Sequence, residues 1–195
     1  MTRDDRPVTF TEQARREQLL SVTVDQVAAR GVAGASLSRI AEAAGITKAA
    51  VLYHFTSKDA LIAAAHAHVL ESLVAAVGAA VDAADTADRP IAYVRAMIAH
   101  LGDHPGHTGV LVAVAMDGTD DYARAERWRP LAGLLEAAAG ARGESRLTDA
   151  EARALAVIVG GAIDGIVAER GDDEDFDVDQ AADLLVALLQ SYLRR

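Results

Sequence analysis

A single glycine, Gly45, separates two short helical patterns in the stretch SLSRIAEAAGITKAAVLYHFTSKDAL, residues 36–61. Ser36 and Thr47 each precede an apolar run, and their hydroxyls can accept hydrogen bonds from the unpaired N–H groups at the start of a helix. Glycine readily takes the left-handed conformation that ends a helix. The stretch therefore predicts a helix, a tight turn and a second helix of about two turns.

An earlier helix completes a compact three-helix module. It is expected to begin near Thr9, because TFTE at residues 9–12 has the Thr-x-x-Glu spacing in which each side chain satisfies the exposed backbone N–H of the other. Apolar positions between Leu20 and Ala28 recur at helical spacing, and Gly31 is expected to end this helix. We predict a first domain over residues 1–56.

The remainder of the chain, residues 57–195, shows helical periodicity and no strand pattern. An apolar stripe from Ser57 predicts one helix of about 40 Å. The segments DTADRP and GDHPGHTG, residues 85–90 and 102–109, are expected to break the chain into further helices. The sequence thus predicts an all-α fold of about nine helices. In it, an N-terminal helix-turn-helix domain is joined by a long helix to a C-terminal helical domain.

The net negative charge of the chain comes from its C-terminal part. Residues 1–58 contain eight Lys and Arg against six Asp and Glu, whereas the remainder contains 11 against 23. The chain has no cysteine, which excludes disulfides and cysteine zinc sites. The charged N-terminus predicts no signal peptide, and no window approaches about 18 uninterrupted apolar residues. We therefore expect a cytoplasmic protein with no membrane segment.

The start of the second short helix offers chemistry suited to DNA. Thr47, Lys48 and Ala49 supply a hydroxyl, a cation and a small residue at a helix N-terminus, where the helix dipole also favours phosphate. A helix that follows a tight turn can enter the major groove while its predecessor crosses the backbone. The spacing alone also allows a second interpretation, a three-helix core in which Tyr53 and Phe55 are simply buried.

The same stretch resembles the N-terminal DNA-binding domain of the TetR family of transcriptional regulators. Residues 36–61 match the family pattern in order, with Ile40-Ala41, Ala44-Gly45 and a short helix that ends in Tyr-His-Phe. The resemblance implies that Ile40, Ala41, Phe55 and Leu61 form core. It also implies that residues on and around the second short helix contact DNA. To these we add residues at the start of the preceding helix, which are placed to hold the flanking DNA backbone. The candidates are Ser36, Ser38, Arg39, Thr47, Lys48, Ala49, Leu52, Tyr53, His54 and Lys58.

Two positions depart from the family pattern. Ala49 stands where the family often has glycine, and Leu52 stands where an aromatic residue is common. These departures leave the domain assignment unchanged and the base preference open.

The sequence contains no convincing metal or catalytic site. His100 and His104 have the i, i+4 spacing of metal ligands on a helix, but Gly102 and Pro105 are expected to break a helix between them. The acidic run at residues 171–180 lacks the central glycine and the final glutamate of a calcium loop. The sequence contains no catalytic nucleophile paired with a general base and no phosphate-binding loop. We therefore expect no metal, no cofactor and no enzymatic activity.

The C-terminal domain, by the resemblance, binds a small-molecule effector. Few charges are available inside this alanine-rich bundle, so we expect an apolar or aromatic effector. For any one residue, filling of the core is the competing interpretation. The candidates are the polar or large residues on its apolar stripes and in its loops: His66, Tyr93, Met97, His100, Met116, Tyr122 and Trp128.

The two closing helices carry apolar stripes wider than one neighbour in the same chain needs. We expect these stripes to point inward, and the surplus to form the interface of a homodimer. Gly161 and Gly165 would let another helix approach closely. The candidate interface residues are Leu155, Ile158, Gly161, Gly165, Leu184, Leu188 and Tyr192.

These observations predict a homodimeric repressor that a small effector releases from a near-palindromic, double-stranded DNA operator. Two alternatives remain, an enzyme and a helical scaffold that binds only protein. The scaffold predicts weak DNA association that salt does not change, whereas a repressor loses affinity steeply as salt rises.

Overall fold

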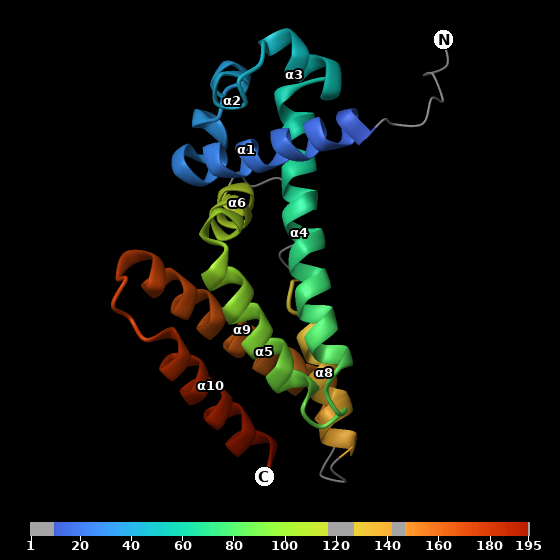
Figure 1. Ribbon diagram of the computed structural model, residues 1–195. Coiled ribbons are helices and arrows are strands. Elements are labelled where there is room, and N and C mark those ends of the chain that lie inside the picture. The colour runs from blue at the N-terminus through green and yellow to red at the C-terminus, as the bar shows by residue number, and fades with distance from the viewer. Residues whose placement is uncertain (1–9, 117–126, 142–146, 195) are drawn as a thin grey trace. The chain divides into compact units, whose positions relative to one another are not determined.

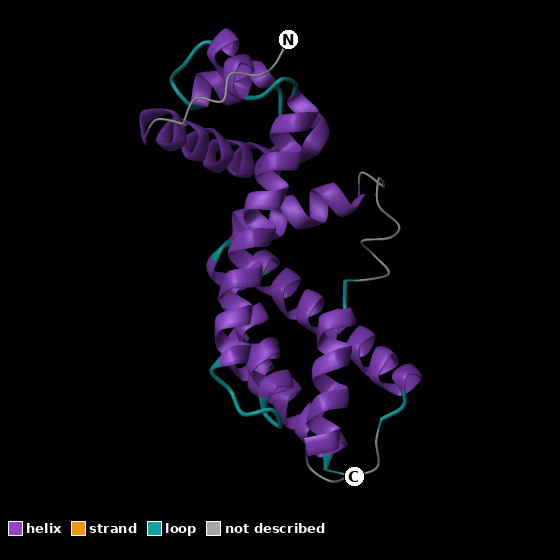
Figure 2. Cartoon of the chain, turned by 90° about the vertical axis from the view of Figure 1, so that its right-hand side faces the viewer, coloured by secondary structure: helices purple, strands orange, loops and turns teal. Residues whose placement is uncertain are grey.

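The computed structural model describes residues 10–116, 127–141 and 147–194. Within these ranges nine helices and no strand occur, which confirms the predicted all-α fold (Figure 2). The chain divides into two compact units, which we describe one at a time. The first unit contains residues 1–70 and 106–117, and the second contains residues 71–105 and 118–195.

The first unit is built around the start of one long helix (Figure 1). Its fully buried residues include Leu19, Ile40, Val51, Leu61 and Val110, and burial of each such side chain stabilises the fold by roughly 1.5–3 kcal/mol. These residues come from all five helices of the unit, so one core holds them together. The helices are α1 (Phe10–Gly34), α2 (Leu37–Ala43), α3 (Lys48–His54), the first part of α4 (Lys58–Asp82), and α6 (Pro105–Met116).

The predicted caps of the short helices are confirmed. The Ser36 hydroxyl accepts a hydrogen bond from the Arg39 N–H at 3.3 Å, and the Thr47 hydroxyl accepts one from the Ala50 N–H at 3.1 Å. Gly31 and Gly45 both have φ of +67°, which glycine adopts without strain. Gly45 follows α2 as expected, whereas Gly31 forms a non-helical kink inside α1, which continues to Gly34. Thr9, the expected start of the first helix, lies outside the described residues.

Helix α6 belongs to the first unit, far along the chain from its neighbours there. At Gly109 it approaches α1 so closely that an added Cβ would lie 2.7 Å from the Cβ of Ala28. Val110 is fully buried in the same core. Periodicity gives no information on which partner a helix packs against, and the domain boundary between residues 56 and 57 stays a prediction.

The second unit packs three helices around α9. Helix α9 contacts α5, α8 and α10, and α5 also contacts α8 and α10. The predicted capping box is present, with the Thr148 hydroxyl accepting from the Glu151 N–H and the Glu151 carboxylate accepting from the Thr148 N–H. Asp177 caps the last helix. The helices are α5 (Arg89–Asp103), α8 (Arg129–Ala141), α9 (Asp149–Asp172) and α10 (Val178–Leu193).

The break predicted at residues 102–109 is confirmed, but it is much shorter than the segment expected to form it. Helix α5 continues through Gly102 to Asp103, and α6 begins at Pro105, so only His104 separates them. A glycine inside a helix costs only about 1 kcal/mol, which packing can offset. Proline is well tolerated at the first position of a helix, because its missing N–H would have no partner there.

Helix α4 has the length and apolar composition of a membrane span, with a mean hydropathy of 1.7 in its most apolar window. Core helices of soluble proteins meet the same two criteria, and a third of this window is buried. The expectation of no membrane segment therefore stays a prediction.

Candidate nucleic-acid interface

The tight turn between α2 and α3 is fixed by backbone hydrogen bonds. The Gly45 N–H donates to the Glu42 carbonyl at 3.1 Å, and the Ile46 N–H donates to the Ala41 carbonyl at 2.9 Å. Ile40 on α2 and Val51 on α3 are fully buried, so each helix turns one face to the core. The opposite face of α3 must then point to solvent.

The outward face of α3 carries the residues predicted to contact DNA. Tyr53 is 75% exposed and Leu52 is 40% exposed, although both are large. Because Tyr53 is exposed, the alternative in which it is buried as core is wrong for this residue. The predicted core residues Ile40, Ala41, Phe55 and Leu61 are all buried. The other outward residues of the set are Thr47, Lys48, Ala49, Ser38 and Arg39, while Ser36, His54 and Lys58 are half-buried.

Two cations of the predicted set are held at the end of α1. The Arg39 guanidinium donates to the Gly34 carbonyl at 3.0 Å, and the Lys58 ammonium donates to the Ala33 carbonyl at 3.4 Å. Carbonyls at a helix C-terminus lack partners within the helix and attract cations. Both side chains are therefore placed by the turn between α1 and α2.

Three residues of α1 that the sequence prediction missed contact the helix-turn-helix. Arg16 donates to the His54 carbonyl at 3.4 Å, Gln18 donates to the Ala44 carbonyl at 3.5 Å, and Glu12 accepts from the Tyr53 hydroxyl at 3.5 Å. The spacing of Glu12 and Arg16 puts them on one face of a helix. This spacing was the only sequence signal for a shared contact surface, and it does not show which residues the two side chains contact.

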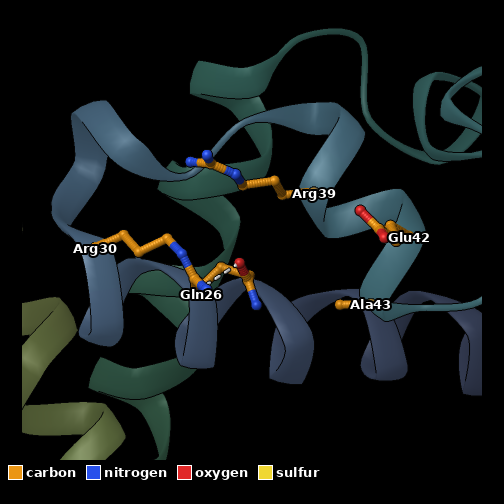
Figure 3. A pocket seen from close by; sticks show the side chains of 5 residues that line it. All are labelled: Gln26, Arg30, Arg39, Glu42 and Ala43. Carbon is orange, nitrogen blue, oxygen red and sulfur yellow. Dashed lines mark hydrogen bonds between the residues drawn. The ribbon is translucent and has the colours of Figure 1, made fainter.

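A shallow, open hollow lies between α1 and α2 in the same unit (Figure 3). Arg30 donates to the Gln26 side chain at 3.1 Å on the α1 side. Arg39, Glu42 and Ala43 line the α2 side. The hollow carries charges of both signs, and of its lining residues only Arg39 was predicted as a site residue.

The predicted effector residues of α5 share one buried face. Tyr93, Met97 and His100 are each less than a tenth exposed, which the i, i+4, i+7 spacing explains. His66 lies half-buried on α4 in the first unit, and burial lowers its pKa. Met116 is the last residue of α6, and Tyr122 lies outside the described residues.

Trp128 belongs to a polar cluster that the sequence did not predict. The Arg127 guanidinium stacks 4.5 Å from the Trp128 ring centre and pairs with the Asp164 carboxylate at 2.7 Å. Burial raises the pKa of Asp164, and Arg127 opposes that rise. Burial also raises the pKa of Tyr93, which Arg127 partly offsets and Asp164 reinforces. Tyr93 and Trp128 thus share this charged pair as neighbours.

His100 and His104 lie closer together than predicted. Since α5 does not break at Gly102, their rings stack with centres 4.5 Å apart. The His104 ring nitrogen Nδ1 lies 2.9 Å from the His100 carbonyl. The expectation that they share no face is wrong, because α5 runs to Asp103 and His104, its C-cap, still donates its backbone N–H to the His100 carbonyl.

Apolar residues of α9 and α10 remain exposed in the second unit. Ile158 is 68% exposed, Leu184 is 63% exposed and Leu188 is 70% exposed. Leu184, Leu188 and Tyr192 were expected to point inward, but the buried face of α10 consists of Ala182, Val186, Leu189 and Leu193. The stripe is wide enough to supply both faces, so the register of the inward face was wrong. By the apolar patch we mean the exposed apolar residues of α9 and α10, which are Val157, Ile158, Leu184, Leu188 and Tyr192. Gly161 and Gly165 of α9 are also exposed.

Comparison with known proteins identifies the first unit. The model of the family described as "Bacterial regulatory proteins, tetR family" matches residues 19–65, from α1 into α4. The HTH-type transcriptional regulator BetI of Ectopseudomonas mendocina is 37% identical over 92 residues, which are 47% of this chain and 46% of the relative. The chain thus spans about half the length of the curated relatives it matches.

Solved structures extend the likeness over most of the chain. A TetR-like transcriptional regulator from Rhodococcus sp. RHA1 is 26% identical with a TM-score of 0.75, covering 92% of this chain and 96% of that chain. AibR, solved in complex with isovaleryl coenzyme A and operator DNA, is 22% identical with a TM-score of 0.72, covering 89% and 97%. At 22% identity, the likeness to AibR shows the fold alone.

Residues 19–65 of the first unit thus match the DNA-binding domain of the TetR family of bacterial regulatory proteins. The relatives are named as transcriptional regulators, which agrees with the expectation that the chain is not an enzyme.

Proposed function

We propose that the protein is a DNA-binding transcriptional regulator whose α3 enters the major groove. The observation that carries this proposal is the exposed outer face of α3 on a helix whose inner face is locked in the core. Tyr53 stands 75% exposed on it, and the exposed Lys48 begins the same helix. An exposed aromatic and a cation at the start of a capped helix suit contacts to base edges and phosphates.

The protein acts as a homodimer joined through the apolar patch on α9 and α10. Large exposed apolar patches mark interaction surfaces, and a two-fold axis lets one patch pair with itself. Two α3 helices then lie about one DNA turn, ~34 Å, apart and read a near-palindromic operator. Leu155, half-buried on α9, borders this interface.

A small apolar or aromatic effector binds the C-terminal domain and releases the operator, so the protein is a cytoplasmic repressor. The buried face of α5 and the neighbouring Trp128 supply apolar and aromatic surface for such a ligand. The structurally similar AibR was solved with isovaleryl coenzyme A, so acyl coenzyme A thioesters belong in the ligand panel. Helix α4 runs from Lys58 at the DNA side into the second unit and is the proposed mechanical link.

The test is selection of double-stranded DNA from a random library by the purified protein. The expected result is a near-palindromic consensus, bound with an affinity that falls steeply as salt rises. Enrichment of no sequence, together with weak binding that salt does not change, would refute the proposal. Addition of an effector should release the selected DNA by no more than the difference in its affinity for the two conformations.

A further inference from the structure

Arg16 of α1 makes two contacts to the C-terminal end of α3. Its guanidinium donates to the His54 carbonyl at 3.4 Å. The same guanidinium lies 4.3 Å from the centre of the Phe55 ring. His54 and Phe55 directly follow the exposed Tyr53, so both contacts fall at the outer end of the proposed recognition helix.

Helix α3 needs such a contact because it is short. It spans only Lys48–His54, and so short a helix is not stable by itself. Its start is capped by Thr47, but its last carbonyls have no partners within the helix. A cation that donates to such a carbonyl also interacts favourably with the negative end of the helix dipole. Arg16 therefore acts as a C-terminal cap supplied by another helix.

The Phe55 ring gives this cap a fixed position. Phe55 is 4% exposed, so its ring is held by the core and cannot follow the guanidinium if that moves. A planar guanidinium stacks on an aromatic face, whereas a lysine ammonium cannot reproduce both the stacking and the directed hydrogen bond. The contact thus ties the end of α3 to the core in one geometry.

Two neighbours on α1 support the same helix-turn-helix. Gln18 donates to the Ala44 carbonyl in the turn before α3, at 3.5 Å. Glu12 accepts from the Tyr53 hydroxyl at 3.5 Å. Helix α1 therefore contacts both the turn before α3 and the last residues of α3. Arg16 lies between Glu12 and Gln18 in the sequence.

We propose that Arg16 is a positioning residue for DNA recognition, which sets the orientation of Tyr53 and His54 without contacting phosphate itself. The inference rests on the proposed DNA-binding function. It differs from a direct phosphate contact, which would weaken binding to every DNA sequence alike and lower the salt dependence by about one ion.

Arg15 provides a matched control. It carries the same charge on the same helix, and its guanidinium donates to the Gln18 side chain at 2.6 Å. Replacement of either arginine by alanine changes the net charge equally. Arg15 reaches the helix-turn-helix only through Gln18, whereas Arg16 contacts His54 and Phe55 itself. A larger loss for Arg16→Ala therefore reports these direct contacts and not the charge.

The experiment uses the full-length protein with its selected operator and with random DNA of the same length. Affinities are measured over a series of salt concentrations for the wild type, Arg15→Ala, Arg16→Ala and Arg16→Lys. We expect Arg16→Ala to lose about tenfold or more in operator affinity relative to Arg15→Ala. Binding to random DNA and the salt slope should match those of Arg15→Ala.

Arg16→Lys keeps the charge and guards against loss of folding in the alanine variant. Its expected result is a loss of operator affinity with the wild-type salt slope, and shifted amide resonances of Tyr53 and His54 in the free protein. Equal operator affinities of Arg16→Ala and Arg15→Ala would overturn the inference, as would full rescue by lysine. Failure of the wild type to select any sequence would instead overturn the proposed function, and the inference with it.

Discussion

The Trp128 ring lies directly on Gly160 of α9, so close that a Cβ at position 160 would overlap three atoms of the ring. The Arg127 guanidinium lies 4.5 Å from the centre of the same ring and pairs with Asp164, one turn further along α9. Replacement of Gly160 by alanine must displace this ring. We expect Gly160→Ala to destabilise the second unit by about 1–3 kcal/mol.

Gly133→Ala on α8 is the matched control, because no atom lies within 4 Å of its added Cβ. Alanine is the better helix former, so this change should stabilise by roughly 0.5–1 kcal/mol. Trp128 is the single tryptophan of the chain, and its fluorescence reports denaturant unfolding of this unit for both variants. Equal midpoints for the two variants would contradict the packing described.

The exposed leucine at position 188 tests the proposed dimer. It is 70% exposed on α10, and a glutamate there would put a carboxylate of each protomer into the proposed interface without disturbing the buried face. We expect Leu188→Glu to sediment as a monomer at concentrations where the wild type is a dimer. Ala137→Glu, on an exposed position of α8, should leave the sedimentation coefficient unchanged. A monomeric wild type, or a dimeric Leu188→Glu, would refute the assignment of this interface.

Lys48 tests the orientation of α3. Its side chain is exposed at the first position of the helix, where it can reach phosphate or a base edge. We expect Lys48→Ala to weaken binding to the selected operator about tenfold or more and to lower the salt slope by about one. Arg153→Ala on α9 removes the same charge and should change neither quantity. A wild-type footprint for Lys48→Ala would show that α3 is not the recognition helix.

His100 makes the stability of the second unit depend on pH. Burial and the neighbouring His104 lower the pKa of His100 below its ordinary value of 6.5, and Asp103 opposes them. Below its ordinary pKa, the unfolded chain then binds more protons at this position than the folded chain. The free energy of unfolding is therefore highest above pH 6.5 and declines as the pH falls below that value. We expect His100→Gln to show a shallower fall in melting temperature between about pH 8 and about pH 5.

Ala99→Gln, on an exposed position of the same helix, serves as the control for that change. Its melting temperature should follow the wild-type pH profile, because it introduces a glutamine without removing a titratable group. Parallel profiles for His100→Gln and the wild type would mean that His100 contributes nothing to the pH dependence.

Local signals accounted for the parts of the fold that depend on neighbouring residues. The caps at Ser36 and Thr47 and the left-handed turn at Gly45 involve side chains within four positions of one another, and all three are confirmed. The break between α5 and α6 was predicted, but its short length was not, because two local rules compete at Gly102 and Pro105. The sequence alone does not show whether packing of the whole helix offsets the small free-energy cost of a glycine inside it.

Contacts between distant residues were not predictable in the same way. Arg16 meets His54 across 38 positions, and Trp128 meets Gly160 across a loop and a helix. Neither partner has a pattern that names the other. The membership of α6 in the first unit, through Gly109 and Ala28, has the same origin.

The most direct test of the account is a hydroxyl-radical footprint of the purified wild-type protein on its selected operator. The account predicts two protected half-sites, related by two-fold symmetry and with centres about one helical turn, ~34 Å, apart. Protection should disappear when an effector binds. A single protected site, or uniform protection along the whole fragment, would contradict the proposal that a homodimer places two α3 helices in successive major grooves.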